Sequence, residues 1–390
     1  MSQTIQNSSE AELYIGLMCG TSIDGVDVAL VEIKPSECQL IDSYLHPIPG
    51  EIKASLRTLC SLADNESKLS PIENRIELMG KVDVQMGSVF ADSVNQFLAL
   101  RNIAAESIMA IGSHGQTIRH QPKLNTPFTF QIGDPNIIAL QTGIQTVADF
   151  RRMDIAAGGQ GAPLAPAFHN AVMRTEKENR IILNLGGIAN ITLLPKDKTS
   201  NVIGFDTGTA NTLMDAWYML HHSQRQDDFD RDSAFAKQGE INQSLLKLCL
   251  ADPYFALPYP KSTGREYFSI GWLNEKINAT IPTISPQDVQ RTLVELSAIT
   301  IAQSIKALSL EAFSVYSCGG GTHNQFLIKR IESYLETTIH PTDQVGVSGD
   351  YLEAMTFAWL AHQRVNALPG NLPSVTGAKA EKVLGAIYLP

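Results

Sequence analysis

Cysteine is scarce in this chain of 390 residues, and its five cysteines are scattered, with no pair at the Cys-x-x-Cys spacing. This pattern offers neither a disulfide framework nor a zinc site, and it favours a reducing compartment. Basic residues are outnumbered: 30 Lys and Arg against 40 Asp and Glu give a net charge of −10, with no basic run. A nucleic-acid-binding protein would show a basic face, so this class is excluded.

Long apolar runs and targeting segments are missing as well. No stretch of about 18 apolar residues is present that could span a membrane. The N-terminal segment MSQTIQNSSEAE is polar and acidic, unlike a signal peptide. We therefore expect a cytoplasmic protein with no membrane partner. With 44% hydrophobic and 18% charged residues, the chain has an ordinary globular composition, and its length predicts two or three domains.

Two common nucleotide-binding motifs are absent, since neither G-x-x-x-x-G-K-[ST] nor G-x-G-x-x-G occurs. Instead, the order apolar strand, glycine turn, apolar strand occurs twice, at residues 13–33 and 180–195. This recurrence indicates an internal duplication. A third glycine turn, at 318–324, follows a predicted strand at 313–317 and precedes a helix predicted to begin near Asn324. That order suits a phosphate or nucleotide, because helix N-termini offer free N–H groups.

The remaining hydrophobic pattern alternates between strand and helix. Apolar residues at intervals of three and four predict a long helix over 72–100. Shorter elements follow: strands at 107–117, 128–132 and 144–148, and a helix at 136–142. This alternation is typical of βα units and predicts an α/β fold with a largely parallel sheet. The loop at 149–166, rich in glycine and proline, marks a boundary between domains of residues 1–150 and 151–390.

Seven segments, in their order along the chain, resemble motifs of the anhydro-N-acetylmuramic acid kinase family. This family lies within the superfamily of actin, sugar kinases and heat-shock-chaperone ATPases. The segments are GTSIDGVD at 20–27, IGSHGQTIRH at 111–120, DFRR at 149–152, GGQGAP at 158–163, GFDTGTAN at 204–211, PKSTGRE at 260–266 and SCGGGTHN at 317–324. No single segment is unusual, but seven in the right order are specific.

The resemblance runs from about residue 13 to Pro390 and implies two duplicated domains of the actin-like (ribonuclease H-like) ATPase fold around a central cleft. The family is cytoplasmic, and its members are phosphotransferases with an alcohol group as acceptor. With ATP and Mg²⁺, they open 1,6-anhydro-N-acetylmuramic acid with water and phosphorylate O6, giving N-acetylmuramic acid 6-phosphate in peptidoglycan recycling. A homodimer is the family expectation. The first domain would hold one phosphate hairpin and part of the sugar site. The second would hold the other hairpin, the catalytic Asp and the adenosine loop, and the last residues of the chain could pack back on the first domain.

The first glycine turn has two interpretations from its own residues. Asp-Gly between apolar runs is typical of a plain β-hairpin, whereas glycines, hydroxyls and a carboxylate together suit an anion and its metal. By resemblance the turn binds the β- and γ-phosphates, and Asp24 is a Mg²⁺ ligand, with an Asx-turn residue as the alternative. The nucleotide-binding residues are then Gly20, Thr21, Ser22, Ile23, Asp24, Gly25, Val26 and Asp27, with Gly186 and Gly187 in the second hairpin and Gly319, Gly320 and Gly321 beneath the adenosine.

Asp206 follows a predicted strand at 202–205, so we expect it at the C-terminal end of that strand, the edge that faces ligands in doubly wound folds. By resemblance it is the catalytic base that takes a proton from water as the water attacks C1. A glycosidase would need a second carboxyl group to protonate the leaving oxygen, but here the phosphoryl group can serve as that electrophile. The alternative role of Asp206 is the N-cap of a helix predicted at 209–220.

Gln116 and Thr117 lie between His114 and His120 in sequence and are candidates for contacts with sugar hydroxyls. The two histidines have no carboxylate or cysteine nearby at ligand spacing, which argues against a metal pair.

Arg151 and Arg152 are candidates for the sugar's lactyl carboxylate, since a planar guanidinium suits bidentate pairing with a carboxylate. An ordinary surface pair is the alternative, and Arg265 is a competitor for the role. Glu353, on a helix predicted at 351–367, is a second carboxylate that could contact the sugar, or a solvated residue near a helix N-terminus.

Two other functions compete with the family's reaction. Another small-sugar kinase of the superfamily would phosphorylate an open sugar without hydrolysis. A chaperone-like ATPase would need a long substrate-binding domain after the ATPase core, which the sequence does not provide.

Overall fold

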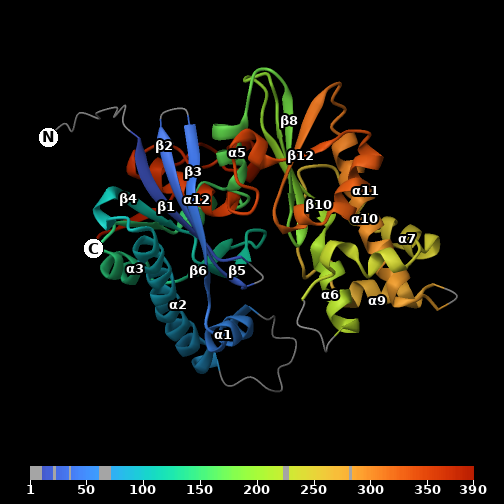
Figure 1. Ribbon diagram of the computed structural model, residues 1–390, viewed down its shortest axis with the longest axis horizontal. Coiled ribbons are helices and arrows are strands. Elements are labelled where there is room, and N and C mark those ends of the chain that lie inside the picture. Colours follow the sequence, from blue (N-terminus) through green and yellow to red (C-terminus); the bar gives the residue numbers. More distant parts are fainter. Residues whose placement is uncertain (1–10, 21–22, 35–36, 61–71, 223–227, 281–282) are drawn as a thin grey trace. The chain divides into compact units, whose positions relative to one another are not determined.

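The computed structural model describes residues 11–20, 23–34, 37–60, 72–222, 228–280 and 283–390. The chain forms two compact units (Figure 1). The first contains Met1–Val172 and Tyr351–Pro390, and the second contains Met173–Asp350. The second unit is therefore inserted between two parts of the first, and residues 151–172 and 351–390 belong with residues 1–150.

The first unit is built on a six-stranded sheet of order β13-β7-β4-β1-β2-β3. Its strands are β1 (Glu12–Met18), β2 (Gly25–Lys34), β3 (Glu37–Pro47), β4 (Ile108–Ser113), β7 (Thr146–Ala148) and β13 (Ala386–Tyr388). A separate hairpin pairs β5 (Gln116–Gln121) with β6 (Phe128–Ile132). The helices are α1 (Gly50–Cys60), α2 (Ile72–Arg101), α3 (Pro135–Thr142), α4 (Phe150–Ala156), α5 (Ala165–Met173), α12 (Leu352–Val365) and α13 (Pro373–Thr376).

Helices cover both faces of this sheet. Ile15 and Leu17 of β1 belong to a core that also contains Met86 and Phe90 of α2. Gly16 lies between them in sequence and so points to the opposite face, where α12 packs. A Cβ on Gly16 would lie 1.8 Å from the Ala354 carbonyl oxygen of α12, so only glycine allows this close approach. The packing fixes the first turn of α12, which carries Glu353.

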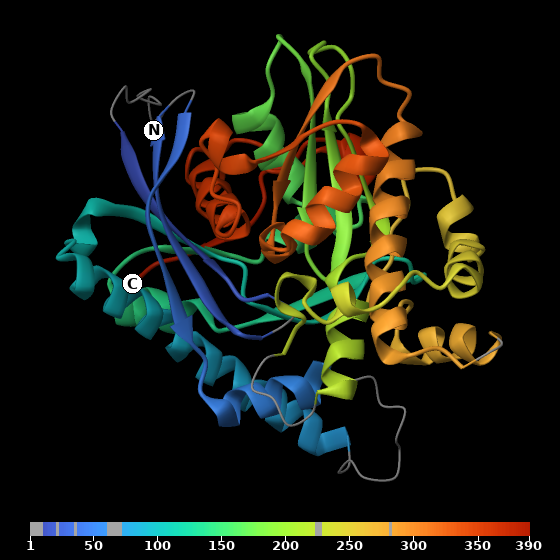
Figure 2. The same ribbon diagram turned by 45° about the vertical axis from the view of Figure 1, so that its right-hand side comes forward.

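The second unit is built on a five-stranded sheet of order β10-β9-β8-β11-β12. Its strands are β8 (Asn179–Leu185), β9 (Ile188–Leu194), β10 (Ile203–Thr209), β11 (Phe313–Cys318) and β12 (Ile339–Pro341). Its helices are α6 (Asn211–His221), α7 (Gln243–Leu250), α8 (Pro253–Ala256), α9 (Ile270–Asn278), α10 (Pro286–Lys306) and α11 (Gln325–Leu335). Figure 2 shows the long helix α10 running beside this sheet, with α11 packed against it.

The two sheets repeat one topology. In the first unit, β3-β2-β1 are antiparallel neighbours and β1-β4-β7 are parallel neighbours. In the second unit, β10-β9-β8 are antiparallel and β8-β11-β12 are parallel. The duplication predicted from the two glycine hairpins therefore extends to five strands of each sheet, and the fold is a mixed α/β fold with two mixed sheets.

Several predicted elements differ from the structure. The long helix, the strands at β6 and β7 and the helix α3 are confirmed. The prediction of only two strands before the long helix was wrong, because β3 and α1 also precede it. β3 gave little apolar signal since most of its side chains are partly or fully exposed. The strand predicted at 107–117 is two strands, β4 and β5, separated at Gly115, whose φ is 74°. The predicted loop at 149–166 begins with the helix α4.

A buried carboxylate joins the two parts of the first unit. Asp154, fully buried in α4, accepts a hydrogen bond from the backbone N–H of Gly161 at 2.7 Å. The Asn371 amide and the Thr376 hydroxyl donate to its other oxygen at 2.7 and 2.8 Å. The segment after α12 is thereby held against the segment after α4.

Burial of His169 in α5 predicts a pH dependence of stability. Burial lowers the pKa of His169 to about 3, whereas an unfolded histidine titrates near about 6.5. Below that pH the unfolded chain binds a proton that the native protein does not, so the free energy of unfolding falls as the pH falls. From pH 7 to pH 5 we expect His169 to remove about 2 kcal/mol. Urea unfolding at both pH values should show a smaller loss for His169→Gln than for the wild type; equal losses would contradict the prediction.

The structure contains no helix long and apolar enough to cross a membrane, within the residues described above.

Candidate functional site

The first glycine turn connects β1 to β2, which pair antiparallel from Met18 and Asp27 outward. The carbonyl of Gly20 accepts the N–H of Ile23 at 3.1 Å. Ile23 has a φ of 60°, a left-handed conformation that is strained for a β-branched residue. Such strain persists only where the surrounding structure imposes it. The predicted ligands Thr21 and Ser22 lie outside the described residues.

The rest of this turn combines structural and polar positions. Gly25 begins β2, and a Cβ there would lie 2.8 Å from the His46 carbonyl oxygen, so this glycine is required by the packing of β3. Val26 is buried, and Asp27 is only partly exposed. Asp24 is exposed, and its backbone carbonyl accepts a hydrogen bond from the Lys53 ammonium at 2.7 Å. The turn thus has a lysine ammonium bonded to one of its backbone carbonyls, and an exposed carboxylate.

The second glycine turn, between β8 and β9, caps a helix. The Gly186 carbonyl accepts from the Asn211 N–H at 3.1 Å, and the Gly187 carbonyl accepts from the N–H groups of Ala210 and Thr212, both at 3.0 Å. In a trans peptide the C=O and the following N–H point in opposite directions. The N–H groups of Gly187 and Ile188 therefore point away from α6. N–H groups that point outward from such a turn can serve an anion.

The third glycine turn follows β11. Gly319 has a φ of 81°, and a Cβ there would lie 2.4 Å from the Asn184 Oδ1 atom. A Cβ on Gly321 would lie 2.7 Å from the Leu185 Cβ atom, whereas a Cβ on Gly320 would meet nothing within 4 Å. Gly319 and Gly321 are thus required by packing against the second hairpin, while Gly320 is exposed and faces open space. The helix α11 follows, with the Asn324 side chain accepting from the Leu327 N–H at 3.1 Å.

Asp206 lies within β10, so the prediction that it ends its strand was wrong. β10 continues to Thr209 because Thr207 and Thr209 are buried and the strand still pairs with β9. The register shifts between Asp206 and Gly208, and bulges of this kind often re-aim a side chain beside an active site. The N-cap alternative is also wrong, because α6 begins at Asn211 after Ala210.

Hydrogen bonds through both its side chain and its backbone hold Asp206 in place. Its Oδ2 atom accepts the backbone N–H of Thr263 at 2.9 Å, and its own N–H donates to the Lys261 carbonyl at 3.0 Å. Its carbonyl accepts the Tyr254 hydroxyl at 2.8 Å. The side chain is partly exposed. A partly exposed carboxylate held by a backbone hydrogen bond suits a general base.

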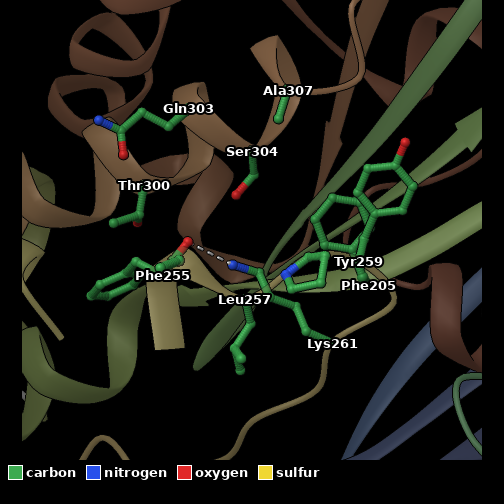
Figure 3. A pocket seen from close by; sticks show the side chains of 11 residues that line it. Phe205, Phe255, Leu257, Tyr259, Lys261, Thr300, Gln303, Ser304 and Ala307 are labelled. Atoms are coloured by element: carbon green, nitrogen blue, oxygen red, sulfur yellow. Dashed lines mark hydrogen bonds between the residues drawn. The ribbon is translucent and has the colours of Figure 1, made fainter. Parts of the chain in front are cut away.

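A pocket of about 300 Å³ lies beside β10 in the second unit (Figure 3). The rings of Phe205 and Tyr259 stack there with centroids 5.1 Å apart, and the Lys261 ammonium donates to the Phe255 carbonyl at 3.3 Å. Phe205 and Asp206 are consecutive in the strand and point to opposite faces. Of the described residues that line the pocket, none is a predicted site residue. The pocket and the Asp206 site share the strand β10 and the segment that contains Lys261.

In the first unit, the half-buried Arg151 contacts the buried His114. Arg151 donates to the His114 Nε2 atom from Nε at 3.1 Å, and its Nη2 atom lies 2.9 Å from the same nitrogen. Its Nη1 atom donates to the Gly161 carbonyl at 2.8 Å. Burial, together with the charge of Arg151, lowers the pKa of His114 well below its ordinary value. The imidazole is therefore neutral, with Nε2 as an acceptor.

The two adjacent arginines have different environments. Burial lowers the pKa of Arg151 to about 10, and the carboxylates of Glu353 and Asp154 oppose this shift. Glu353, in the first turn of α12, is thus an electrostatic neighbour of Arg151. Arg152 is exposed and pairs with Asp149 at 3.2 Å. The structure therefore brings together Arg151 and Glu353 and leaves Arg152 at the surface.

Gln116 and Thr117 begin β5. Gln116 is 1% exposed, and its Oε1 atom is buried with no hydrogen-bond partner among the described residues. A buried acceptor without a partner is costly unless a ligand or water satisfies it. The Thr117 hydroxyl accepts from the Gln131 amide at 3.1 Å. Gln116 is therefore the better placed of the two for a ligand hydroxyl.

Among the described residues, no group of three or more His, Cys, Asp or Glu side chains is arranged to hold a metal ion. The exposed carboxylate of Asp24 could hold Mg²⁺ only with water or ligand oxygens completing the coordination. Mg²⁺ commonly keeps such ligands.

Two residues that the predictions missed join these groups. Lys53 contacts the first turn from α1, but nothing in its sequence context distinguishes it from a solvated helix lysine. His114 was considered only as a metal ligand. Its position in the IGSHGQT segment next to Gln116 was the signal that could have identified it.

Comparison with known proteins gives the following matches. A family model described as "Anhydro-N-acetylmuramic acid kinase" matches residues 12–390. A protein of that name from Coxiella burnetii (strain RSA 493 / Nine Mile phase I) is 48% identical over 378 residues, which cover 97% of each chain. Its counterpart from Xylella fastidiosa is 48% identical over 386 residues, covering 98% of this chain and 97% of that one. One solved structure, the activator of the 2-hydroxyisocaproyl-CoA dehydratase from Clostridium difficile with bound ADPNP, is 13% identical with a TM-score of 0.43, covering 91% of this chain and 96% of that chain.

Proposed function

This chain belongs to the anhydro-N-acetylmuramic acid kinase family, and on that premise we propose which of its residues carry out the reaction. The protein is an ATP-dependent kinase that acts on 1,6-anhydro-N-acetylmuramic acid in peptidoglycan recycling. One observation of the structure supports the assignment most. Each unit contains the same glycine hairpin, and the second unit holds Asp206 in the strand next to its hairpin.

The two glycine turns bind the phosphates of ATP in this proposal. Phosphoryl transfer needs positioned donors and neutralised charge more than covalent chemistry by the protein. In the second unit, the N–H groups of Gly187 and Ile188 supply donors. In the first, Lys53 supplies a positive charge beside the turn and Asp24 holds Mg²⁺, whose role when bound is to neutralise phosphate charge. Loss of turnover in EDTA and its recovery with added Mg²⁺ would test this; full activity without divalent cations would oppose it.

Asp206 acts as the general base. It takes a proton from the water that attacks C1, while the bond from C1 to O6 breaks and O6 attacks the γ-phosphorus. The hydrogen bond from the Thr263 N–H holds the carboxylate in position. Arg151 and Glu353 contact the sugar, with Arg151 pairing with the lactyl carboxylate and Gln116 accepting from a hydroxyl.

To test the proposal, the purified protein is incubated with ATP and either 1,6-anhydro-N-acetylmuramic acid, the open sugar, or no sugar. ADP and N-acetylmuramic acid 6-phosphate should form rapidly only with the anhydro sugar. A clear preference for the open sugar would favour a small-sugar kinase without ring hydrolysis. ADP production without any sugar would point to a nucleotide switch.

Gly320 provides a specific test of the adenosine loop. A Cβ on Gly320 meets no protein atom within 4 Å, so Gly320→Val should fold normally while placing bulk where adenosine approaches the backbone. We expect weaker ATP binding, by about tenfold or more if one ordinary steric contact is disturbed, and nearly unchanged sugar binding in calorimetric titrations with each ligand.

Gly321→Ala is the matched control, because its Cβ would lie 2.7 Å from Leu185. This variant should lose thermal stability. Equal weakening of both ligands by Gly320→Val would mean that the loop has a structural role instead.

We also propose that the protein is a homodimer and cytoplasmic, on the expectation from the family. Sedimentation should then give a species of twice the monomer mass of 42.5 kDa, and cell fractionation should recover the protein in the cytoplasmic fraction. A monomer at micromolar concentration, or recovery with the envelope, would contradict the respective proposal.

A further inference from the structure

Arg265 lies over the second glycine turn. A Cβ on Gly187 would be 3.2 Å from both the Nε and Nη2 atoms of Arg265 and 2.6 Å from the Thr212 hydroxyl oxygen. The guanidinium and the hydroxyl therefore converge on the side of Gly187 that lacks a side chain. Glycine is needed here because any larger residue would displace both groups.

The segment that carries Arg265 is held at both ends. At its start, Lys261 and Thr263 bond to Asp206 through their backbones. At its end, the N–H of Phe268 donates to the Gly264 carbonyl at 3.2 Å, and Phe268 is fully buried. One short segment thus links the proposed base to the turn that binds phosphate.

The two side chains that converge here have no partner among the residues that the structure describes. Arg265 is exposed and makes no ion pair or hydrogen bond with any described residue. The Thr212 hydroxyl is buried, and it too lacks a partner among the described residues. Buried hydroxyls are normally hydrogen-bonded, so this one points to a ligand or water. The N–H groups of Gly187 and Ile188 point away from α6, as described above.

We propose that Arg265 is a further catalytic residue, whose guanidinium binds the transferring phosphoryl group beside the N–H groups of Gly187 and Ile188. This inference rests on the proposed assignment of the second glycine turn to the phosphates. A guanidinium is planar, permanently charged and suited to paired contacts with phosphate oxygens. This proposal excludes the alternative that Arg265 binds the lactyl carboxylate of the sugar.

The reaction that Arg265 assists needs no reactant other than water, the sugar and ATP. The water oxygen bonds to C1 as its proton passes to Asp206, and the C1–O6 electron pair goes to O6. O6 bonds to the γ-phosphorus, and the bond from that phosphorus to the bridging oxygen breaks, leaving the electron pair on ADP. Negative charge spreads over the transferring group during this exchange, and a fixed cation next to it lowers the barrier.

The experiment compares Arg265→Ala, Arg265→Lys and the wild type with ATP and the anhydro sugar. For Arg265→Ala we expect kcat to fall about 10²-fold or more, the usual cost of one preorganised charge-stabilising donor. KM for the sugar should change little. Added guanidinium at millimolar concentration should restore part of the kcat of Arg265→Ala, but none of the kcat of Asp206→Asn. Arg265→Lys should recover little, because an ammonium lacks the planar fork.

Arg101→Ala is the matched control, since Arg101 is a surface arginine of the first unit, paired with Asp42 at 2.5 Å. Its kcat should match that of the wild type, with or without guanidinium. The proposal is overturned if Arg265→Ala retains kcat within about threefold. A raised KM for the sugar with unchanged kcat, or a loss that guanidinium does not restore in a protein of normal stability, overturns it equally. If Arg265→Ala does not fold, Arg265→Gln replaces it. Absence of turnover in the wild type would instead refute the function itself.

Discussion

Asp206→Asn should lower turnover by roughly 10² to 10⁴, the usual range for removal of a positioned general base. Asparagine keeps the size of the side chain and can still accept the hydrogen bond that Thr263 donates at 2.9 Å, so the local structure should survive. What is lost is the oxygen that takes the proton from water. ATP and sugar should still bind, because neither binding event depends on that proton transfer, and calorimetry with each ligand checks this.

The same variant tests whether ring opening and phosphorylation are one event. If O6 attacks the phosphorus as it leaves C1, then the rates at which ADP and opened sugar form must fall together in Asp206→Asn. In heavy-oxygen water, the wild type should place the label on C1 and never between O6 and phosphorus, because O6 comes from the substrate. Opened sugar without phosphate, or label in the phosphate ester, would instead indicate a hydrolase followed by an ordinary kinase.

Arg151→Ala should remove most of the preference for a sugar that carries the lactyl group. Three of the five N–H donors of Arg151 are directed at His114 and Gly161, which leaves two for a carboxylate. We expect a loss of about 2–5 kcal/mol in selectivity against the anhydro sugar without that group, the usual cost of truncating one partner of a buried charge pair. The ratio of kcat/KM values for the two sugars measures the loss.

Arg152→Ala is the matched control, because the two arginines are adjacent but only Arg151 is directed inward. Arg152 is exposed and pairs with Asp149, so its removal should change selectivity by less than about 1 kcal/mol. If Arg151→Ala keeps its discrimination while remaining folded, the carboxylate is recognised elsewhere. A larger effect from Arg152→Ala would reverse the assignment.

The sequence predicted those elements of the fold that have a short, local pattern of their own. The two glycine hairpins, the helix from Ile72 to Arg101 and the third glycine turn before Asn324 all have a periodic or turn-specific pattern, and the structure confirms them. β3 lacks such a pattern because it is a largely exposed edge strand. Its absence from the prediction also hid the correspondence between β3 and β10, and with it the full extent of the duplication.

The candidate site was harder to predict because its geometry depends on residues far apart in the chain. Asp206 was identified by resemblance, but its place inside β10 depends on pairing with β9 and on the segment at 261–263. Choosing between Arg151 and Arg152 required the contact with His114, 37 residues away. The role of Lys53 depends on the packing of α1 beside the first turn, which no short motif encodes.

The insertion of the second unit has a consequence for synthesis on the ribosome. Residues 173–350 are continuous, so that unit has all of its strands as soon as they have emerged. The first unit has most of its sheet earlier, but the helix that covers Gly16 and the partners of Asp154 come only after residue 350. Until then, one face of its sheet lacks its covering helix and a buried carboxylate lacks two of its donors. Since domains tend to fold as units during translation, the unit whose synthesis begins first is completed last.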